Sequence, residues 1–229
     1  ISVNKDFKIL FFYPNEFTSG IASSNFAILS ACLKQDGFNN IKIFDGFTYK
    51  SKKINQDQAR ENAGVVKKTD IDKYTNFKDD EFMLEDFIKM VDEFKPNIIA
   101  VTLVDVMIDL TLSYLSKIKD RKIPIVSGGV SSTFLYNELL NTNLIDYVCI
   151  GEGEEALVEL CNKLYKNEDC YNIKNIYLKN KNGTIIKNSL RPLVNLDTLP
   201  IPDFSIYNNT RFYRPFRGNV VKTLQIDID

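Results

Sequence analysis

The chain has 229 residues, 44% of them hydrophobic, and a formal net charge of −1, which suits one globular domain with additional elements or two small domains. The balanced charge argues against a general electrostatic nucleic-acid binder, which is normally basic, and no apolar run approaches the roughly 18 residues of a membrane-spanning helix. The chain contains no histidine, which excludes a Ser-His-Asp triad and a His-ligated zinc site within it.

The first third of the chain predicts two strands and one helix, followed by an insertion. Residues 8–13 are a short apolar run closed by Pro14-Asn15, as expected for a buried strand and its loop. Apolar residues then recur at helical spacing in 23–35, and 41–44 is a second strand-like run. Residues 47–80 are polar and weakly periodic, so we expect an insertion with one short helix.

The middle of the chain repeats the strand–helix unit three more times. Residues 97–103 are a nearly continuous apolar run, typical of a parallel strand covered on both faces. Five strands separated by helices predict a flavodoxin-like (Rossmann-like) doubly wound α/β fold with a five-stranded parallel sheet, whose ligands bind beyond the carboxyl ends of the strands. The other expected elements are helices 81–94, 108–119, 133–141 and 156–165 and strands 123–126 and 146–150.

After residue 166 the elements become short. The runs 173–178 and 184–187 flank Asn182-Gly183, a strong signal for a C-terminal β-hairpin. Residues 196–204 are punctuated by Pro and Asp, which indicates a linker, and 220–228 is expected to be a strand.

We therefore expect an α/β domain over residues 1–168 that carries the insertion at 47–80. Residues 169–229 would hold the hairpin, the linker and the start of a further domain.

The four cysteines are Cys32, Cys149, Cys161 and Cys170, and they form no CxxC pair. Cys32 lies in a helical pattern and Cys149 in a strand pattern, so we expect them to act as small buried side chains. Free thiols fit a reducing compartment, and the cytoplasm is the predicted location.

Two glycine-containing loops follow strands at the expected ligand edge. Ser127-Gly128-Gly129 follows the fourth strand, and paired glycines allow a ligand or another backbone to come close. Gly151-Glu152-Gly153 follows the fifth strand and precedes acidic residues that suit a first helical turn. Taken alone, each loop also fits a plain strand–helix turn or a helix cap.

The other loops bear on alternative ligands. The loop from Asn15 to Gly20 lacks both GxGxxG and a Walker lysine, and the Gly151 loop lacks the third glycine, so a nucleotide-binding interpretation loses its main support. Asp105, after the third strand, could contact a polar ligand group or cap the next helix. The segment 211–217 alternates three arginines with aromatic residues, which in a neutral chain favours a docking linker over a nucleic-acid site.

Together these loops resemble the amino-terminal cobalamin-binding domain of radical S-adenosylmethionine (SAM) enzymes. The resemblance covers roughly residues 8–165, and its most specific parts are Val126-Ser-Gly-Gly129 and, at this separation, Asp146-Tyr-Val-Cys-Ile-Gly-Glu-Gly-Glu154. The segment 196–203 also looks like the linker before the radical SAM barrel in that family, where a CxxxCxxC motif holds an iron–sulfur cluster. The resemblance implies that this chain is truncated before that barrel.

The resemblance implies a corrinoid whose nucleotide tail enters the edge of the sheet. Because the chain has no histidine, the DxHxxG mode, in which a histidine ligates cobalt, is impossible, and cobalamin would bind His-off. The implied cofactor-binding residues are Thr102, Ser127, Gly128, Gly129, Gly151, Glu152 and Gly153 along the cleft, and Asn15, Gly20, Val104 and Asp105 beneath the corrin.

The resulting expectation is a cobalamin-binding module of a radical SAM methyltransferase, with no catalytic residue and no metal ligand of its own. A 4Fe-4S cluster and SAM would belong to the missing domain, and the expected partners are the corrinoid and that domain, with no membrane and no nucleic acid. Two alternatives stay open. One is a nucleotide- or flavin-dependent Rossmann-like enzyme, and the other is a non-enzymatic α/β scaffold or sensory module that has lost cobalamin binding.

Overall fold

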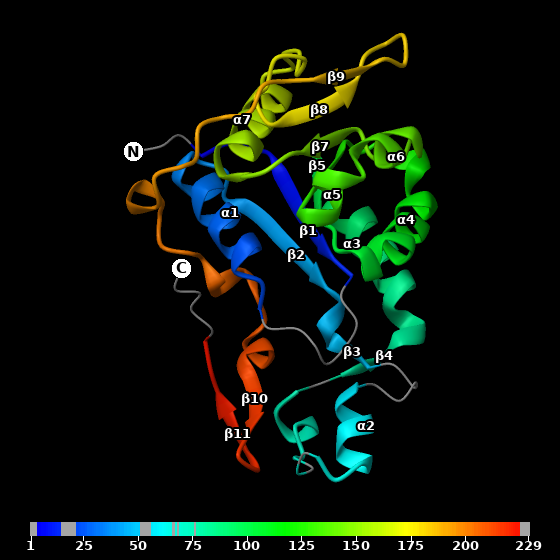
Figure 1. The fold of residues 1–229 in the computed structure, drawn as a ribbon, viewed down its shortest axis with the longest axis vertical. Coiled ribbons are helices and arrows are strands. Elements are labelled where there is room, and N and C mark those ends of the chain that lie inside the picture. Colours follow the sequence, from blue (N-terminus) through cyan, green and yellow to red (C-terminus); the bar gives the residue numbers. More distant parts are fainter. Residues whose placement is uncertain are drawn as a thin grey trace.

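The computed structural model describes residues 4–14, 22–50, 56–65, 67, 69–75 and 77–224. Within these ranges, seven strands form one sheet in the order β2-β1-β5-β6-β7-β8-β9 (Figure 1). The first five in this order are parallel, which confirms the predicted flavodoxin-like sheet. They are β1 (Lys8–Tyr13), β2 (Asn40–Asp45), β5 (Ile98–Thr102), β6 (Ile125–Gly128) and β7 (Tyr147–Cys149).

The predicted hairpin is present and extends this sheet. Strand β8 (Ile176–Lys179) runs antiparallel to β7, and β9 (Ile185–Lys187) pairs with β8. The turn between them contains Gly183, whose φ is 79°, a conformation that favours glycine over other residues.

Helices cover both faces of the sheet because successive residues of a strand point to opposite sides. On one face lie α1 (Ser24–Gln35) and α7 (Glu154–Tyr165), with Phe26 of α1 against Phe11 at 4.9 Å between ring centroids. On the other face Phe87 stacks on Phe12 at 4.1 Å. That face is covered by α3 (Met83–Phe94), α4 (Ile108–Lys117) and α6 (Tyr136–Asn141).

The helix predicted over 133–141 is split in two. Helix α5 (Val130–Phe134) begins directly after Gly129, and α6 starts after Leu135. The backbone of Leu135 has φ −108° and ψ 22°, which leaves the helical range and separates the two short helices.

The described residues of the insertion and the hairpin of residues 213–222 pack together as a small lobe beyond the carboxyl end of β2 (Figure 1). The insertion holds the one predicted short α-helix, α2 (Gln56–Asn62), and the rings of Tyr74 and Tyr213 lie 5.2 Å apart across the lobe. Its strands are the parallel pair β3 (Tyr49–Lys50) and β4 (Lys78–Asp79) and the antiparallel pair β10 (Tyr213–Phe216) and β11 (Asn219–Lys222).

The strand predicted over 220–228 is observed as β11, which ends at Lys222 and pairs with β10. Arg217 and Gly218 both have positive φ, 49° and 77°, as a tight two-residue hairpin turn requires. That turn pairs β11 with β10 of the same chain. Residues 225–229, on which the rest of the prediction falls, lie outside the described part.

The predicted linker belongs to a longer segment, residues 188–212, which we call the strap. It runs from the end of β9 past α7 and α1 toward the lobe (Figure 1). Short 3-10 turns interrupt it at Leu196–Thr198, Phe204–Ile206 and Asn209–Phe212. Ion pairs fix the strap to the domain: Arg191 with Glu155 and Glu159, Asp203 with Lys34, and Arg211 with Asp45 at 2.7 Å. Two hydrogen bonds add to them, from the Ser30 hydroxyl to Asp203 and from the Tyr207 hydroxyl to the carbonyl of Ser23.

The four cysteines are free and buried, as predicted. Burial, and then the nearby carboxylate of Glu154, raises the pKa of the Cys149 thiol to about 12. In the described ranges, no helix has both the length and the apolar character needed to cross a membrane. The same residues include no group of three or more His, Cys, Asp or Glu side chains arranged to hold a metal ion.

Candidate functional site

The predicted site loops after β5, β6 and β7 share one edge of the sheet. Strands β1, β5, β6 and β7 are neighbours and parallel, so their carboxyl ends lie together. The register places Thr102 opposite Gly128. Since alternate residues share a face, Thr102 and Gly128 lie on the side of α1 and α7, as does Cys149.

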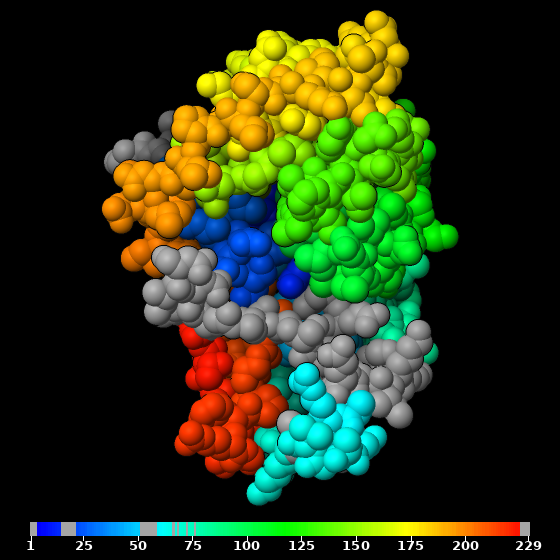
Figure 2. Space-filling view, viewed as in Figure 1, coloured from blue at the N-terminus to red at the C-terminus, as the bar shows by residue number. Residues whose placement is uncertain are grey.

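The surface is hollowed at this edge. Figure 2 shows a depression between the blue atoms of α1 and the green atoms of the segment after β6, below the yellow-green atoms that follow β7. We call this edge of the sheet the edge groove and define it by Thr102, Gly128, Cys149 and Gly153, which the strand register and the surroundings of the two glycines bring together. Asn15 and Gly20, which the sequence assigns to the neighbouring loop, lie outside the described residues.

The two glycines after β6 differ in what the fold requires of them. Gly129 has φ 95°, and a Cβ there would lie 2.8 Å from the carbonyl oxygen of Leu103, so close packing of the loops after β5 and β6 demands a glycine. At Gly128 a Cβ would meet only the Cβ of Cys149, at 3.9 Å. The packing of this chain therefore leaves room for a Cβ at Gly128.

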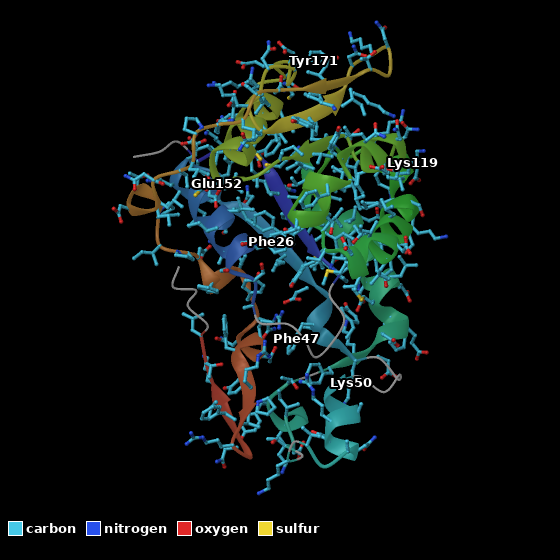
Figure 3. All side chains as sticks on the ribbon, in the orientation of Figure 1. Phe26, Phe47, Lys50, Lys119, Glu152 and Tyr171 are labelled. Atoms are coloured by element: carbon cyan, nitrogen blue, oxygen red, sulfur yellow. The ribbon has the colours of Figure 1, made fainter. Side chains whose placement is uncertain are left out.

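The loop after β7 forms one wall of the edge groove. Gly153 packs near the side chains of Leu29 and Cys149, while Gly151 has φ 73° and open space where a Cβ would lie. Glu152 lies where the strap passes the start of α7 (Figure 3). Its Oε2 accepts a hydrogen bond from the backbone N–H of Val194 at 2.7 Å, so its carboxylate already has a protein partner.

Neither Ser127 nor Asp105 lies on the groove floor. Ser127 shares the face of Ile125, on the side of α4, and is fully buried, and its hydroxyl has no hydrogen-bond partner among the described residues. Asp105 accepts a hydrogen bond from the Ser131 hydroxyl at 2.5 Å, which ties the loop after β5 to the start of α5. It precedes helix α4 without a side-chain cap bond of its own.

Large apolar side chains are exposed on the loops beside the groove. Val104 is 40% exposed and Val106 is 89% exposed after β5, while Val130 is 68% and Phe134 is 75% exposed in α5. Exposed apolar groups gathered beside a groove mark a binding surface. Of the four, the sequence predicted only Val104. For Val106 and Val130 the available signal was an apolar residue between predicted helices and strands, where turn chemistry favours polar residues. Phe134 lies in the helix predicted over 133–141 and gave no such signal.

A separate cavity of about 840 Å³ lies between α1, α7 and the strap. Its lining includes Cys32, Asp36, Glu154, Asn162 and Leu199. Asp36 in this lining is paired with Lys5 at 2.5 Å, so part of its charge is satisfied within the chain. This cavity contains none of the predicted site residues.

The residues at the edge fit a corrinoid. A long nucleotide tail needs backbone and small side chains along its path, and Gly128, Gly153 and Thr102 are residues of that kind. The exposed valines and Phe134 offer apolar surface of the kind that a corrin ring would need. The Ser127 hydroxyl is buried on the opposite face of the sheet, and Ser127 stays a predicted contact.

Comparison with known proteins identifies a domain family. A profile of the B12 binding domain matches residues 20–161, more than half of the chain. No curated protein matches the chain.

Solved structures show the same fold at low sequence identity. The radical SAM methyltransferase TsrM from Kitasatospora setae, with cobalamin and a [4Fe-4S] cluster bound, is 17% identical with a TM-score of 0.57, over 88% of this chain and 31% of that one. The cobalamin-dependent SAM radical enzyme OxsB, with aqua-cobalamin bound, is 14% identical with a TM-score of 0.61, over 88% of this chain and 25% of that one. The chain thus spans less than a third of the length of these structures. From its sequence profile and its fold, the chain belongs to the B12-binding domain family.

Proposed function

We propose that the edge groove holds the nucleotide tail of a corrinoid and that the exposed apolar loops face the corrin ring. The observation that carries this proposal is Gly128. The fold itself leaves room for a Cβ there, and Gly128 and Thr102 are paired neighbours on the groove side of the sheet. A groove kept free of side chains at its floor suits a ligand that passes over the backbone.

Individual residues then take distinct parts. The Thr102 hydroxyl and the backbone at Gly128 and Gly153 would contact the tail, while Gly129 holds the loops after β5 and β6 close together. The loop that begins at Gly151 would close one side of the groove.

The corrin would lie against Val104 and Val130, with Asp105 fixing their loops through its bond to Ser131. Asn15 and Gly20 remain predicted contacts on the neighbouring loop. Because the chain has no histidine, none of its side chains can supply an imidazole to the cobalt.

The larger protein is proposed to be a radical SAM methyltransferase. TsrM and OxsB, which share the fold, are radical SAM proteins several times longer than the matched region. A bound corrinoid would supply a cobalt centre able to carry a methyl group, and a further domain would supply the 4Fe-4S cluster and SAM. The division into residues 1–168 and 169–229 remains our prediction, and four free buried thiols support a reducing, cytoplasmic location.

A retention experiment tests the binding proposal. The protein is mixed with hydroxocobalamin or, in parallel, with flavin mononucleotide, desalted, and examined by its visible spectrum. We expect near-stoichiometric corrinoid and no retained flavin. Gly128→Val should lose the corrinoid, whereas Ser113→Val, which places the same side chain on the exposed side of α4, should keep it. Retention of flavin alone, or of neither ligand, would contradict the proposal.

A further inference from the structure

The carboxylate of Glu152 connects the groove wall to the strap. Its Oε2 accepts the backbone N–H of Val194 at 2.7 Å. These residues are 42 positions apart in sequence, so the bond joins the loop after β7 to a distant segment of the chain. A hydrogen bond to an ionised acceptor is among the stronger ones in proteins.

A second residue, Asn175, links the same two segments. It is buried and has φ 68°. Its Nδ2 donates to the carbonyl of Glu152 at 2.9 Å, and its Oδ1 accepts the backbone N–H of Arg191 at 2.6 Å. Its own carbonyl accepts the N–H of Ile150 at 2.7 Å. The groove wall and the start of the strap therefore share one hydrogen-bond network.

The start of the strap is also fixed to α7 by ion pairs. The guanidinium of Arg191 pairs with Glu155 at 3.0 Å and with Glu159, both in α7. Glu152 is thus held at two points, through its carboxylate by the N–H of Val194 in the strap and through its carbonyl by Asn175, whose side chain also bonds the strap at Arg191.

We propose that Glu152 is a positioning residue that couples occupancy of the edge groove to the position of the strap. The inference rests on the proposed corrinoid function and assigns Glu152 a role through Val194 rather than through contact with the cofactor. A ligand that favours one wall conformation also favours the strap conformation bonded to it, and the coupling is reciprocal. The position of the strap would thereby change with corrinoid occupancy, and so would the surface that its outer side offers to a partner.

Hydrogen exchange and binding, measured on the same variants, test this coupling. The exchange rate of a peptide covering 190–196 is recorded with and without hydroxocobalamin, and the affinity for hydroxocobalamin is measured by titration. The variants are Glu152→Ala, Glu152→Gln, whose amide oxygen can still accept from Val194, and Glu168→Ala, a control that removes an exposed carboxylate from a weak 4.0 Å pair.

We expect hydroxocobalamin to slow exchange of the 190–196 peptide about tenfold in the wild type, in Glu168→Ala and in Glu152→Gln. Glu152→Ala should lose this protection and bind hydroxocobalamin about tenfold more weakly. If the wild type binds hydroxocobalamin without any change in strap exchange, the coupling is wrong while the proposed function stands. The coupling is also wrong if Glu152→Ala binds weakly yet keeps full strap protection, the result expected of a direct cofactor contact. Should Glu152→Ala not fold, the wild-type exchange result still decides. A wild type that retains no hydroxocobalamin overturns the proposed function, and the coupling with it.

Discussion

The adjacent glycines after β6 should respond differently to an added methyl group. At Gly129, alanine would have to adopt φ 95° with its Cβ 2.8 Å from the carbonyl oxygen of Leu103. Such a strained backbone together with a displaced carbonyl costs about 3 kcal/mol. At Gly128 the added Cβ makes an ordinary 3.9 Å contact with Cys149, so Gly128→Ala should change stability by no more than about 0.5 kcal/mol.

Thermal unfolding measures this contrast. A chain of this size loses about 2–4 °C of Tm per kcal/mol, which predicts a fall of about 6–12 °C for Gly129→Ala and of less than about 2 °C for Gly128→Ala. The unfolding curve is followed by circular dichroism without ligand. An unchanged Tm for Gly129→Ala would refute the close approach of the two loops.

The substitution Gly128→Val separates an effect on binding from an effect on stability. A valine at position 128 suits a strand backbone, but it places a branched side chain on the groove floor. We expect its Tm to remain near that of the wild type and its affinity for hydroxocobalamin to fall at least about tenfold, which corresponds to about 1.4 kcal/mol. Wild-type affinity in Gly128→Val would show that the ligand does not pass over this residue.

Three further predictions concern the strap and the thiols. Arg211→Ala leaves the nearly buried carboxylate of Asp45 without its 2.7 Å partner and should cost about 3–5 kcal/mol, seen as a lower Tm; an unchanged Tm would contradict a structural role for this pair. Burial raises the pKa of Asp203, but hydrogen bonds from Lys34 and two serines outweigh it and hold that pKa at about 2. Its stabilising contribution is therefore present above the unfolded pKa of about 4 and is lost as pH falls from about 4 to about 2, and Asp203→Asn should flatten the pH dependence of Tm in this window. In native protein at pH 7.5 none of the four cysteines should react quickly with a thiol reagent, because all are buried and burial raises the pKa of Cys149 to about 12; rapid modification of any of them would contradict this packing.

The sheet could be predicted from the sequence because its central strands are buried on both faces. Ile98–Thr102 and Lys8–Tyr13 are apolar nearly throughout, and the regular helices between strands leave few topologies. The same logic placed Thr102, Gly128 and Gly151 at one edge, since the carboxyl ends of parallel strands meet there.

The finer geometry of the site depends on contacts that sequence spacing does not encode. Ser127 and Gly128 are neighbours, yet one faces α4 and the other faces the groove, and a shift of one residue in the strand would exchange them. Glu152 bonds Val194, 42 residues away, and Tyr74 meets Tyr213 across the lobe. Such long-range pairs follow from the complete fold.

The location of cobalt in crystals grown with hydroxocobalamin tests the central claim most directly. Anomalous scattering at the cobalt edge gives the metal position independently of any interpretation of the ligand. We predict one strong peak beside Val104 and Val130, with tail density running over Gly128. A peak in the cavity between α1, α7 and the strap, or no peak in crystals of protein saturated with corrinoid, would contradict the account.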